Sequence, residues 1–159
     1  VMWTEFVSAD GLFLGGFEHL IKDLAFTEEE RPIVAQFFGS NVETMQKADG
    51  AGLAAPQVRQ SVAICVIAKI YTSKKEDDLI LINPKWKRAS LLKEWDIEGC
   101  LSAPNIWGKV KRYKKIKVEA LNKNGELIKF KASDILARII QHEVDHLNGI
   151  LFIEKAKGL

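Results

Sequence analysis

The stretch Gln141-His142-Glu143-Val144-Asp145-His146 decides the fold of this chain. Its two histidines are four positions apart, so both lie on one side of a helix, about one turn from each other. Both imidazoles can bind one ion, and Glu143 points to a neighbouring face, where it can reach a water activated by that ion. The stretch therefore predicts a helix that carries a metal site.

The residues around this stretch predict that the helix is buried. Ser133-Asp134 are typical of a helix start, and Asn148-Gly149 are typical of its end. Between them, apolar residues recur at helical spacing. Two exposed histidines on a surface helix are the alternative, but buried polar groups need partners, and a bound cation would provide one. The apolar positions are Ile135, Leu136, Ile139, Ile140, Val144 and Leu147.

A catalytic metal site needs a third ligand and one open position. Downstream of the histidines the sequence offers Glu154 and no further histidine, whereas upstream it offers Cys100 in Glu98-Gly99-Cys100-Leu101-Ser102. Taken alone, Cys100 would be interpreted as a core thiol, as Cys65 is in the apolar run 62–68. Beside the histidine pair it is the candidate third ligand, in a set that suits Fe(II), Zn(II), Ni(II) or Co(II).

The segment Gly50-Ala51-Gly52-Leu53-Ala54-Ala55-Pro56-Gln57 is the third candidate. Its glycines permit close approach of the backbone to a ligand, and the Gln57 amide can donate a hydrogen bond to a developing oxyanion. The alternative is a tight loop before a strand. The segment is not a phosphate loop, because no Lys-Ser or Lys-Thr pair follows.

The composition of the chain limits the classes of protein to which it can belong. The chain has 159 residues, 47% of them hydrophobic, and a net charge of +2, which fits one domain without a nucleic-acid footprint. We expect no membrane span, no secretory signal and a reducing cytoplasm for the two cysteines. The basic cluster Lys109–Lys117 is a local exception, which we interpret either as a solvated strand or as a surface facing ribosomal RNA.

The pattern of strands and turns predicts an α+β fold, with antiparallel or mixed sheets around the central helix that carries the HExxH motif. We expect strands at 62–68 and 79–82, the second ending at Asn83-Pro84, and a strand pair within 85–97. Lys123-Asn124-Gly125 predicts a hairpin turn, and 150–153 a short terminal strand.

Together, the three motifs GxGLAAxQ, EGCLS and QHExDH resemble peptide deformylase over residues 42–153. That family removes the N-formyl group from the initiator methionine of new polypeptides. The resemblance implies the deformylase fold and one divalent ion, Fe(II) in the cell, with Zn(II), Ni(II) or Co(II) in a purified sample. It implies Cys100, His142 and His146 as metal ligands, and Glu143 as general base on the metal-activated water and then as acid.

The resemblance also implies substrate contacts. Gln57 and the backbone N–H of Leu101 would stabilise the oxyanion, and Gly52 and Gly99 would line the groove for the extended peptide. The methionine side chain would enter a pocket near Ala51 and Ile139. Trp107 would lie beside the groove. Glu98 and Gln141 are expected to support the ligands.

Residues 2–46 carry a second resemblance, to a fragment of tRNA-dihydrouridine synthase, through 4–11 and 31–40. Too little of that barrel is present for tRNA-modifying activity. We therefore expect an atypical segment 1–41 packed on a catalytic domain 42–159, with a helix within Pro32–Lys47 covering the core.

Two other functions stay open at this point. An HExxH endopeptidase would take its third ligand downstream, and a non-catalytic metal-binding domain would lack activity. The expected partners are N-formylmethionyl nascent peptides, and the ribosome through Lys109–Lys117. The expected location is the bacterial-type cytoplasm, with an organelle as the alternative.

Overall fold

The helix predicted from the histidine spacing forms the centre of the structure, as α5 (Asp134–Leu147). The computed structural model describes residues 50–72 and 77–159. Ser133 has an extended backbone at the N-cap, and Gly149 takes a positive φ of 72° just after the helix. Both ends therefore lie where the cap residues predict them, because glycine adopts the left-handed conformation without a steric cost.

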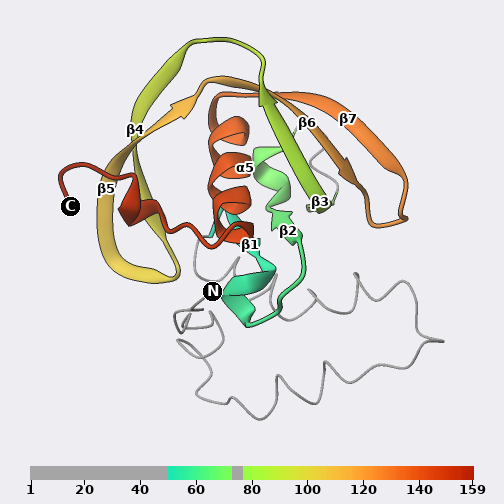
Figure 1. Ribbon diagram of the computed structural model, residues 1–159, viewed down its shortest axis with the longest axis horizontal. Helices are drawn as coiled ribbons and strands as arrows, with labels where there is room; N and C mark the ends of the chain where they lie inside the picture. Colours follow the sequence, from blue (N-terminus) through green and yellow to red (C-terminus); the bar gives the residue numbers. More distant parts are fainter. Residues whose placement is uncertain (1–49, 73–76) are drawn as a thin grey trace.

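A five-stranded antiparallel sheet packs on one side of α5 (Figure 1). Its order is β1-β2-β3-β6-β7, with β1 at one edge and β7 at the other. Apolar side chains of α5 and of the sheet form one buried cluster that includes Leu81, Val118 and Ile140. The strands are β1 (Gly52–Ala54), β2 (Ile64–Ile67), β3 (Leu79–Arg88), β6 (Lys115–Leu121) and β7 (Leu127–Ser133).

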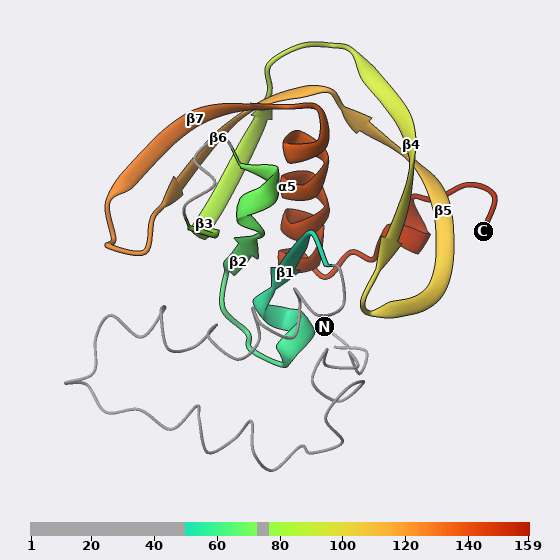
Figure 2. The same cartoon turned by 180° about the vertical axis from the view of Figure 1, so that it is seen from behind.

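A separate two-stranded sheet lies on the other side of α5, as the two opposite views show (Figures 1 and 2). It consists of β4 (Lys93–Cys100) and β5 (Ala103–Tyr113). The last residue of β4 is Cys100, so this sheet carries the candidate thiolate toward the helix that carries the histidines. Short 3-10 helices complete the described chain at Ala55–Val58, Lys69–Tyr71 and Phe152–Glu154.

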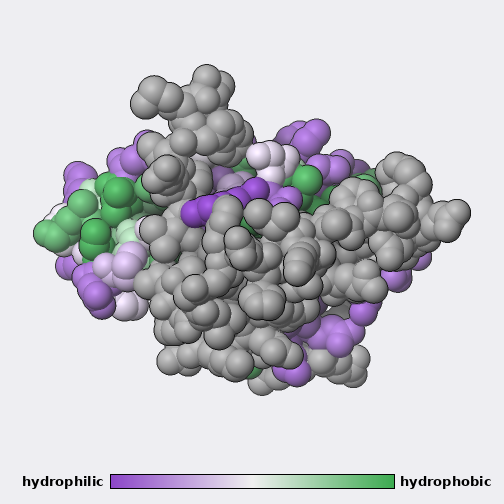
Figure 3. Space-filling view, turned by 90° about the horizontal axis from the view of Figure 1, so that it is seen from below, coloured by the Kyte–Doolittle hydropathy of each residue, from purple (hydrophilic) through white to green (hydrophobic). Residues whose placement is uncertain are grey.

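Apolar side chains gather on the side of the molecule where β4 and β5 lie (Figure 3). The exposed large apolar residues of β4, β5 and the C-terminus are Trp95, Ile97, Ile106, Trp107 and Leu159. No helix in the described part of the chain is long and apolar enough to cross a membrane.

Several sequence predictions are confirmed. The fold is α+β, Cys65 is fully buried in the core, and Gly125 takes a positive φ of 78° in the hairpin between β6 and β7. The segment 50–57 is more than a loop, because Gly52–Ala54 forms the edge strand β1.

Three predictions of strand limits are wrong. Asn83-Pro84 does not end a strand, because β3 continues to Arg88 through a register shift between Ile82 and Lys85, with Asn83 at a φ of 51°. The proline lies at a β-bulge, where its lack of a backbone N–H does not interrupt the hydrogen bonds between the strands. Residues 85–97 do not pair with one another, since 85–88 pair with β6 and 93–97 with β5. The predicted strand 150–153 is replaced by the 3-10 helix Phe152–Glu154.

The expectations for the segment 1–41 and for a helix within Pro32–Lys47 fall on residues outside the described ranges.

Candidate metal centre and active site

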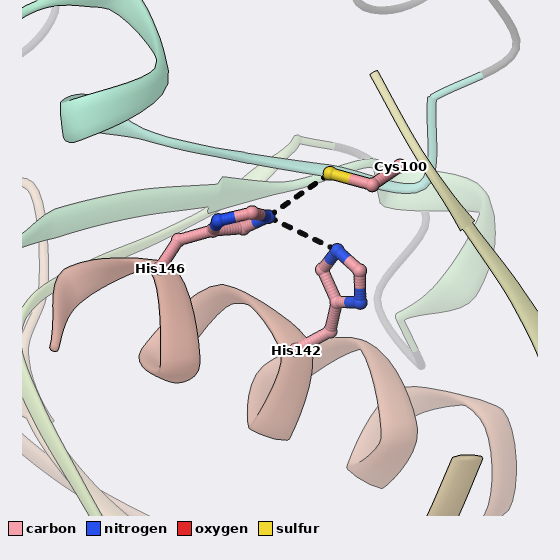
Figure 4. Close-up of side chains that lie close together, drawn as sticks. All are labelled: Cys100, His142 and His146. Atoms are coloured by element: carbon pink, nitrogen blue, oxygen red, sulfur yellow. Dashed lines mark hydrogen bonds between the residues drawn. The ribbon is translucent and has the colours of Figure 1, made fainter. Parts of the chain in front are cut away.

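Three side chains converge at the centre of the molecule, two from α5 and one from the end of β4 (Figure 4). His146 Nε2 lies 3.1 Å from Cys100 Sγ and 3.1 Å from His142 Nε2. One donor atom from each residue lies within 4.8 Å of the others. The structure thus brings together the three residues expected to hold the metal.

The donor set and its spacing fit one tetrahedral ion. Bond lengths of about 2.1 Å to nitrogen and 2.3 Å to sulfur correspond to donor separations of about 3.4–3.6 Å at the tetrahedral angle. Two of the three separations, at 3.1 Å, are a few tenths of an ångström shorter, and all three donor atoms lie within 4.8 Å of one another, so side-chain rotations would admit an ion. A thiolate with two imidazoles suits Zn(II), Fe(II), Ni(II) and Co(II) alike.

Glu98 fixes the orientation of the His142 ring through the ring nitrogen that faces away from the other metal ligands. Its Oε2 lies 3.0 Å from His142 Nδ1, which leaves His142 Nε2 facing the other donors. Arg112 donates to both carboxylate oxygens of Glu98 at 2.9 Å, and Arg138 donates to Oε1 at 2.7 Å. Burial alone would raise the pKa of Glu98, but the bonds from Arg112 and His142 outweigh it and hold that pKa well below its usual range. Glu98 is therefore an anion that orients an imidazole.

The sequence did not lead us to expect that either arginine supports a metal ligand. Arg112 lies in the run Lys109–Lys117, which we interpreted as a solvated strand or an RNA-facing surface, yet it is only 5% exposed and also pairs with Asp145. The strand alternation carried the missing signal, because Arg112 lies on the same face as the buried Val110. The run is divided between β5 and β6 and does not form one surface.

Glu143 lies beside the ligands in a confined position. It is 3% exposed, and a Cβ added to Gly52 would come within 2.6 Å of its Oε1. Its Oε2 has no hydrogen-bond partner among the described residues. Burial raises the pKa of Glu143 to about 7. A carboxyl group with a pKa near neutrality, adjacent to a metal site, is suited to both accept and donate a proton.

Gln57 is held with its amide nitrogen toward Cys100. Its Oε1 accepts from the Ala54 backbone N–H at 2.8 Å, and its Nε2 donates to Ser102 Oγ at 3.0 Å and lies 3.6 Å from Cys100 Sγ. The Ser102 N–H also points to that sulfur, at 3.4 Å. Leu101, between the two, packs on the cluster of Leu53, Val58 and Ala68.

The residues expected to bind a peptide surround this centre. The edge strand β1 pairs with β2 on one side only within the described residues, so its other edge can take an extended chain. Gly99 lies opposite Trp107 in the ladder, and a Cβ on Gly99 would lie 2.7 Å from the indole ring. Ala51 and Ile139 belong to the same core cluster.

The other candidates lie elsewhere. Glu154, the downstream residue that an endopeptidase site would use, accepts from the Leu151 backbone N–H at 2.8 Å and belongs to no metal cluster in the described chain. Gln141 bonds to the Tyr113 backbone through its Oε1 and Nε2, so it supports the contact of α5 with β5 and does not touch the ligands.

Comparison with known proteins identifies relatives over most of the chain. A family model described as polypeptide deformylase matches residues 21–159. A peptide deformylase of Desulfitobacterium hafniense is 43% identical over 145 residues, which are 89% of this chain and 91% of the relative. One of Carboxydothermus hydrogenoformans is 42% identical over 141 residues, 88% of this chain and 89% of the relative.

Solved structures agree with these sequence matches. A peptide deformylase from Synechococcus elongatus, in complex with actinonin, superposes with a TM-score of 0.68 at 39% identity, over 83% of this chain and 70% of its own. One from Thermotoga maritima gives 0.71 at 32% identity, over 99% of both chains. The second resemblance, to tRNA-dihydrouridine synthase, is not supported, and the family model itself extends into residues 21–46 of that stretch.

Proposed function

Since the chain belongs to the polypeptide deformylase family, it removes the N-formyl group from newly made polypeptides, and we propose which of its residues perform the reaction. Deformylases of this family are metalloenzymes. In this chain Cys100, His142 and His146 would hold one divalent ion, Fe(II) in the cell, with Zn(II), Ni(II) or Co(II) as substitutes in a purified sample. The cluster of their three donor atoms within 4.8 Å is the observation that carries the proposal. The ion would supply Lewis-acid activation of water and of the formyl carbonyl.

Glu143 is the general base and then the general acid. Its buried carboxylate, with a pKa near 7, accepts a proton from the attacking water and returns it to the amine that leaves. Gly52 supports this role, because the absence of a side chain there leaves room for Glu143 Oε1.

The oxyanion that forms at the formyl carbon is stabilised by Gln57 Nε2 and by the backbone N–H of Leu101. Gln57 is suited to this because its Oε1 is fixed by Ala54, which leaves the amide hydrogens facing Cys100. Donors fixed before the reaction need no reorganisation when the charge develops.

The substrate peptide lies extended beside Gly52 and Gly99, and its backbone pairs with the open edge of β1. The methionine side chain enters the apolar region of Ala51 and Ile139. Trp107, which is 64% exposed, contacts the peptide beyond the methionine. Residues 42–159 make up the catalytic domain in this proposal, and the segment 1–41 covers it.

The partners follow from the substrate. N-formylmethionyl nascent peptides are bound as they are made, in the bacterial-type cytoplasm, and contact with the ribosome would bring the enzyme close to them. An endopeptidase is less well supported, because Glu154 lies in a 3-10 turn outside the metal cluster and the third donor is Cys100.

The test is hydrolysis of formyl-Met-Ala under anaerobic conditions by Fe(II)- or Ni(II)-loaded protein, with Glu143→Gln as the isosteric control. We expect formate release by the parent protein, and a loss of about 100-fold or more in kcat for the variant with unchanged metal content. A folded, metal-loaded parent protein that releases no formate would reject the assignment of these roles.

A further inference from the structure

The strands β3, β6 and β7 expose a strongly basic face on the side away from α5. Trp86, Val118 and Phe130 pack toward the core cluster, so the residues that alternate with them point the other way. All of these outward residues are exposed. We call them the lysine face: Lys85, Lys87, Lys117, Glu119, Lys129 and Lys131.

Strand register places three of these lysines in one row. Lys87 lies opposite Lys117, and Lys117 lies opposite Lys131. Like charges directly opposite each other destabilise a sheet. Within residues 50–72 and 77–159, none of the three has a carboxylate within ion-pair distance. Repulsion within this row of lysines therefore destabilises the sheet, and a bound anion would reduce that repulsion.

The neighbouring row only partly balances this charge. Lys85 lies opposite Glu119, which lies opposite Lys129, and Lys129 Nζ is 2.8 Å from Glu119 Oε2. The bond from Lys129 lowers the pKa of Glu119, with smaller contributions from Lys85 and Lys87. Five lysines and one glutamate give this small face a charge of +4, whereas the whole chain carries +2.

The lysine face is also hollowed. A hollow of about 610 Å³ is lined by residues 85–87 of β3, 117–119 of β6 and 129–131 of β7. Six of its nine lining residues are charged, and Trp86, Val118 and Phe130 alternate with them along the strands. An interfacial membrane anchor would need several apolar side chains among the basic ones, whereas among the described residues the exposed large apolar side chain on this side of the sheet is Leu127, at the start of β7.

We propose that the lysine face binds the phosphate backbone of RNA. Flexible ammonium groups on a broad, shallow surface match a chain of phosphates, which needs charge neutralisation without sequence-specific contacts. Of the basic stretch Lys109–Lys117, Lys117 and the exposed Lys115 two positions before it lie on this side of the sheet. The RNA surface is therefore assembled from β3 and from the β6–β7 hairpin, which is distant from β3 in sequence. Attachment to RNA would hold a deformylase near the place where its substrates are made. This benefit rests on the proposed function, whereas the binding of RNA itself does not.

The test uses the full chain and a short fluorescein-labelled oligouridine, with fluorescence anisotropy measured over a range of salt concentrations. The first variant combines Lys87→Gln, Lys117→Gln and Lys131→Gln. The matched control combines Lys93→Gln, Lys111→Gln and Lys157→Gln, three lysines on the other sheet and the C-terminal segment that lie over the rings of Tyr113 and Trp95. Both variants change the net charge by the same amount.

The proposal predicts that the first variant binds the oligouridine about tenfold more weakly at low salt. Each phosphate contact contributes about −0.7 to the slope of log K against log salt for a single strand, so the slope should become shallower by about 2. The control should keep the parent slope and affinity. Hydrolysis of formyl-Met-Ala should be the same in all three proteins.

Three results would overturn the proposal: no binding of oligouridine by the parent protein, equal loss in both variants, or binding of phosphatidylserine vesicles without binding of RNA. None of them would affect the catalytic roles, which are measured separately by formate release.

Discussion

At the scale of single residues, Glu98 connects the metal ligands to the rest of the molecule. Its carboxylate is 6% exposed and accepts from Arg112 and Arg138 while it orients His142. Arg138 also donates to the Glu94 and Val110 carbonyl oxygens, which joins α5 to both strands of the small sheet. Glu98 thus pairs with two buried guanidinium groups and fixes one imidazole, and Asp145 is a second partner of Arg112.

We predict that Glu98→Gln destabilises the protein by about 3–5 kcal/mol, because it leaves the buried Arg138 without a buried carboxylate and Arg112 with Asp145 alone. It should also weaken metal binding by about tenfold to 100-fold, since the supporting carboxylate of His142 is lost. Denaturant unfolding and metal titration measure the two effects. Glu94→Gln on the same strand is the control, because its exposed pair with Lys114 should contribute less than about 1 kcal/mol. Equal effects of the two substitutions would contradict the role of Glu98.

Gly52→Ala tests the position of Glu143. A Cβ at residue 52 would lie 2.6 Å from Glu143 Oε1, so the carboxylate must move. We expect kcat to fall by about 100-fold, the contribution of a well-placed proton-transfer group, while bound metal stays at one ion per chain. Steady-state kinetics and metal analysis on the same sample distinguish this from loss of the site. Unchanged kcat would show that Glu143 does not act from this position.

The metal ligands can be identified from the sequence, but the buried arginines that hold Glu98 beside them cannot. Cys100, His142, His146, Glu143 and Gln57 stand in motifs whose chemistry can be recognised from residue type and spacing. Arg112 and Arg138 lie 14 and 40 positions from Glu98, and a charged residue is expected to be exposed unless its partner is known. Their burial follows only from the tertiary pairing.

At the scale of elements, local signals predicted turns and caps, whereas strand ends depended on the sheet. Gly125 and Gly149 take the positive φ values that their turn and cap require. Asn83-Pro84 predicts a strand end because proline lacks an N–H, but a bulge lets β3 continue to pair with β6. The end of a strand is decided by the partner that continues beside it, and the partner was not known.

The lysine row gives a prediction about stability at this scale. Lys117→Thr should stabilise the protein by about 0.2–1 kcal/mol, because it removes a charge that lies between Lys87 and Lys131 and places a β-branched residue in a strand. Lys129→Thr in the adjacent strand should stabilise less or destabilise, because it removes the pair with Glu119. Chemical denaturation of both variants measures the difference. A larger gain for Lys129→Thr would contradict the arrangement.

At the scale of the whole molecule, two sheets hold α5 between them and contribute to the site from both sides. The small sheet supplies Cys100, the helix supplies the histidines, and the edge of the large sheet places Gly52 against Glu143. The sequence predicted the central helix, whereas the division of the strands into two sheets became visible only in the structure, because strand pairing is a long-range property.

A site that contains a thiolate and is open to substrate should make the iron form sensitive to air. We predict that Fe(II)-loaded protein loses activity on exposure to air, because a thiolate-ligated ferrous ion can be oxidised, while Ni(II)-loaded protein keeps its activity. Formate release before and after exposure measures the loss. Equal survival of both forms over hours in air would count against this coordination.

The central claim is that one ion binds between β4 and α5. Anomalous X-ray diffraction from crystals of the Zn(II)-loaded protein tests it most directly. The account predicts a single strong peak about 2.3 Å from Cys100 Sγ and about 2.0–2.1 Å from the Nε2 atoms of His142 and His146. A peak at any other group of side chains, or one at the histidines with the Cys100 sulfur out of bonding distance, would contradict it.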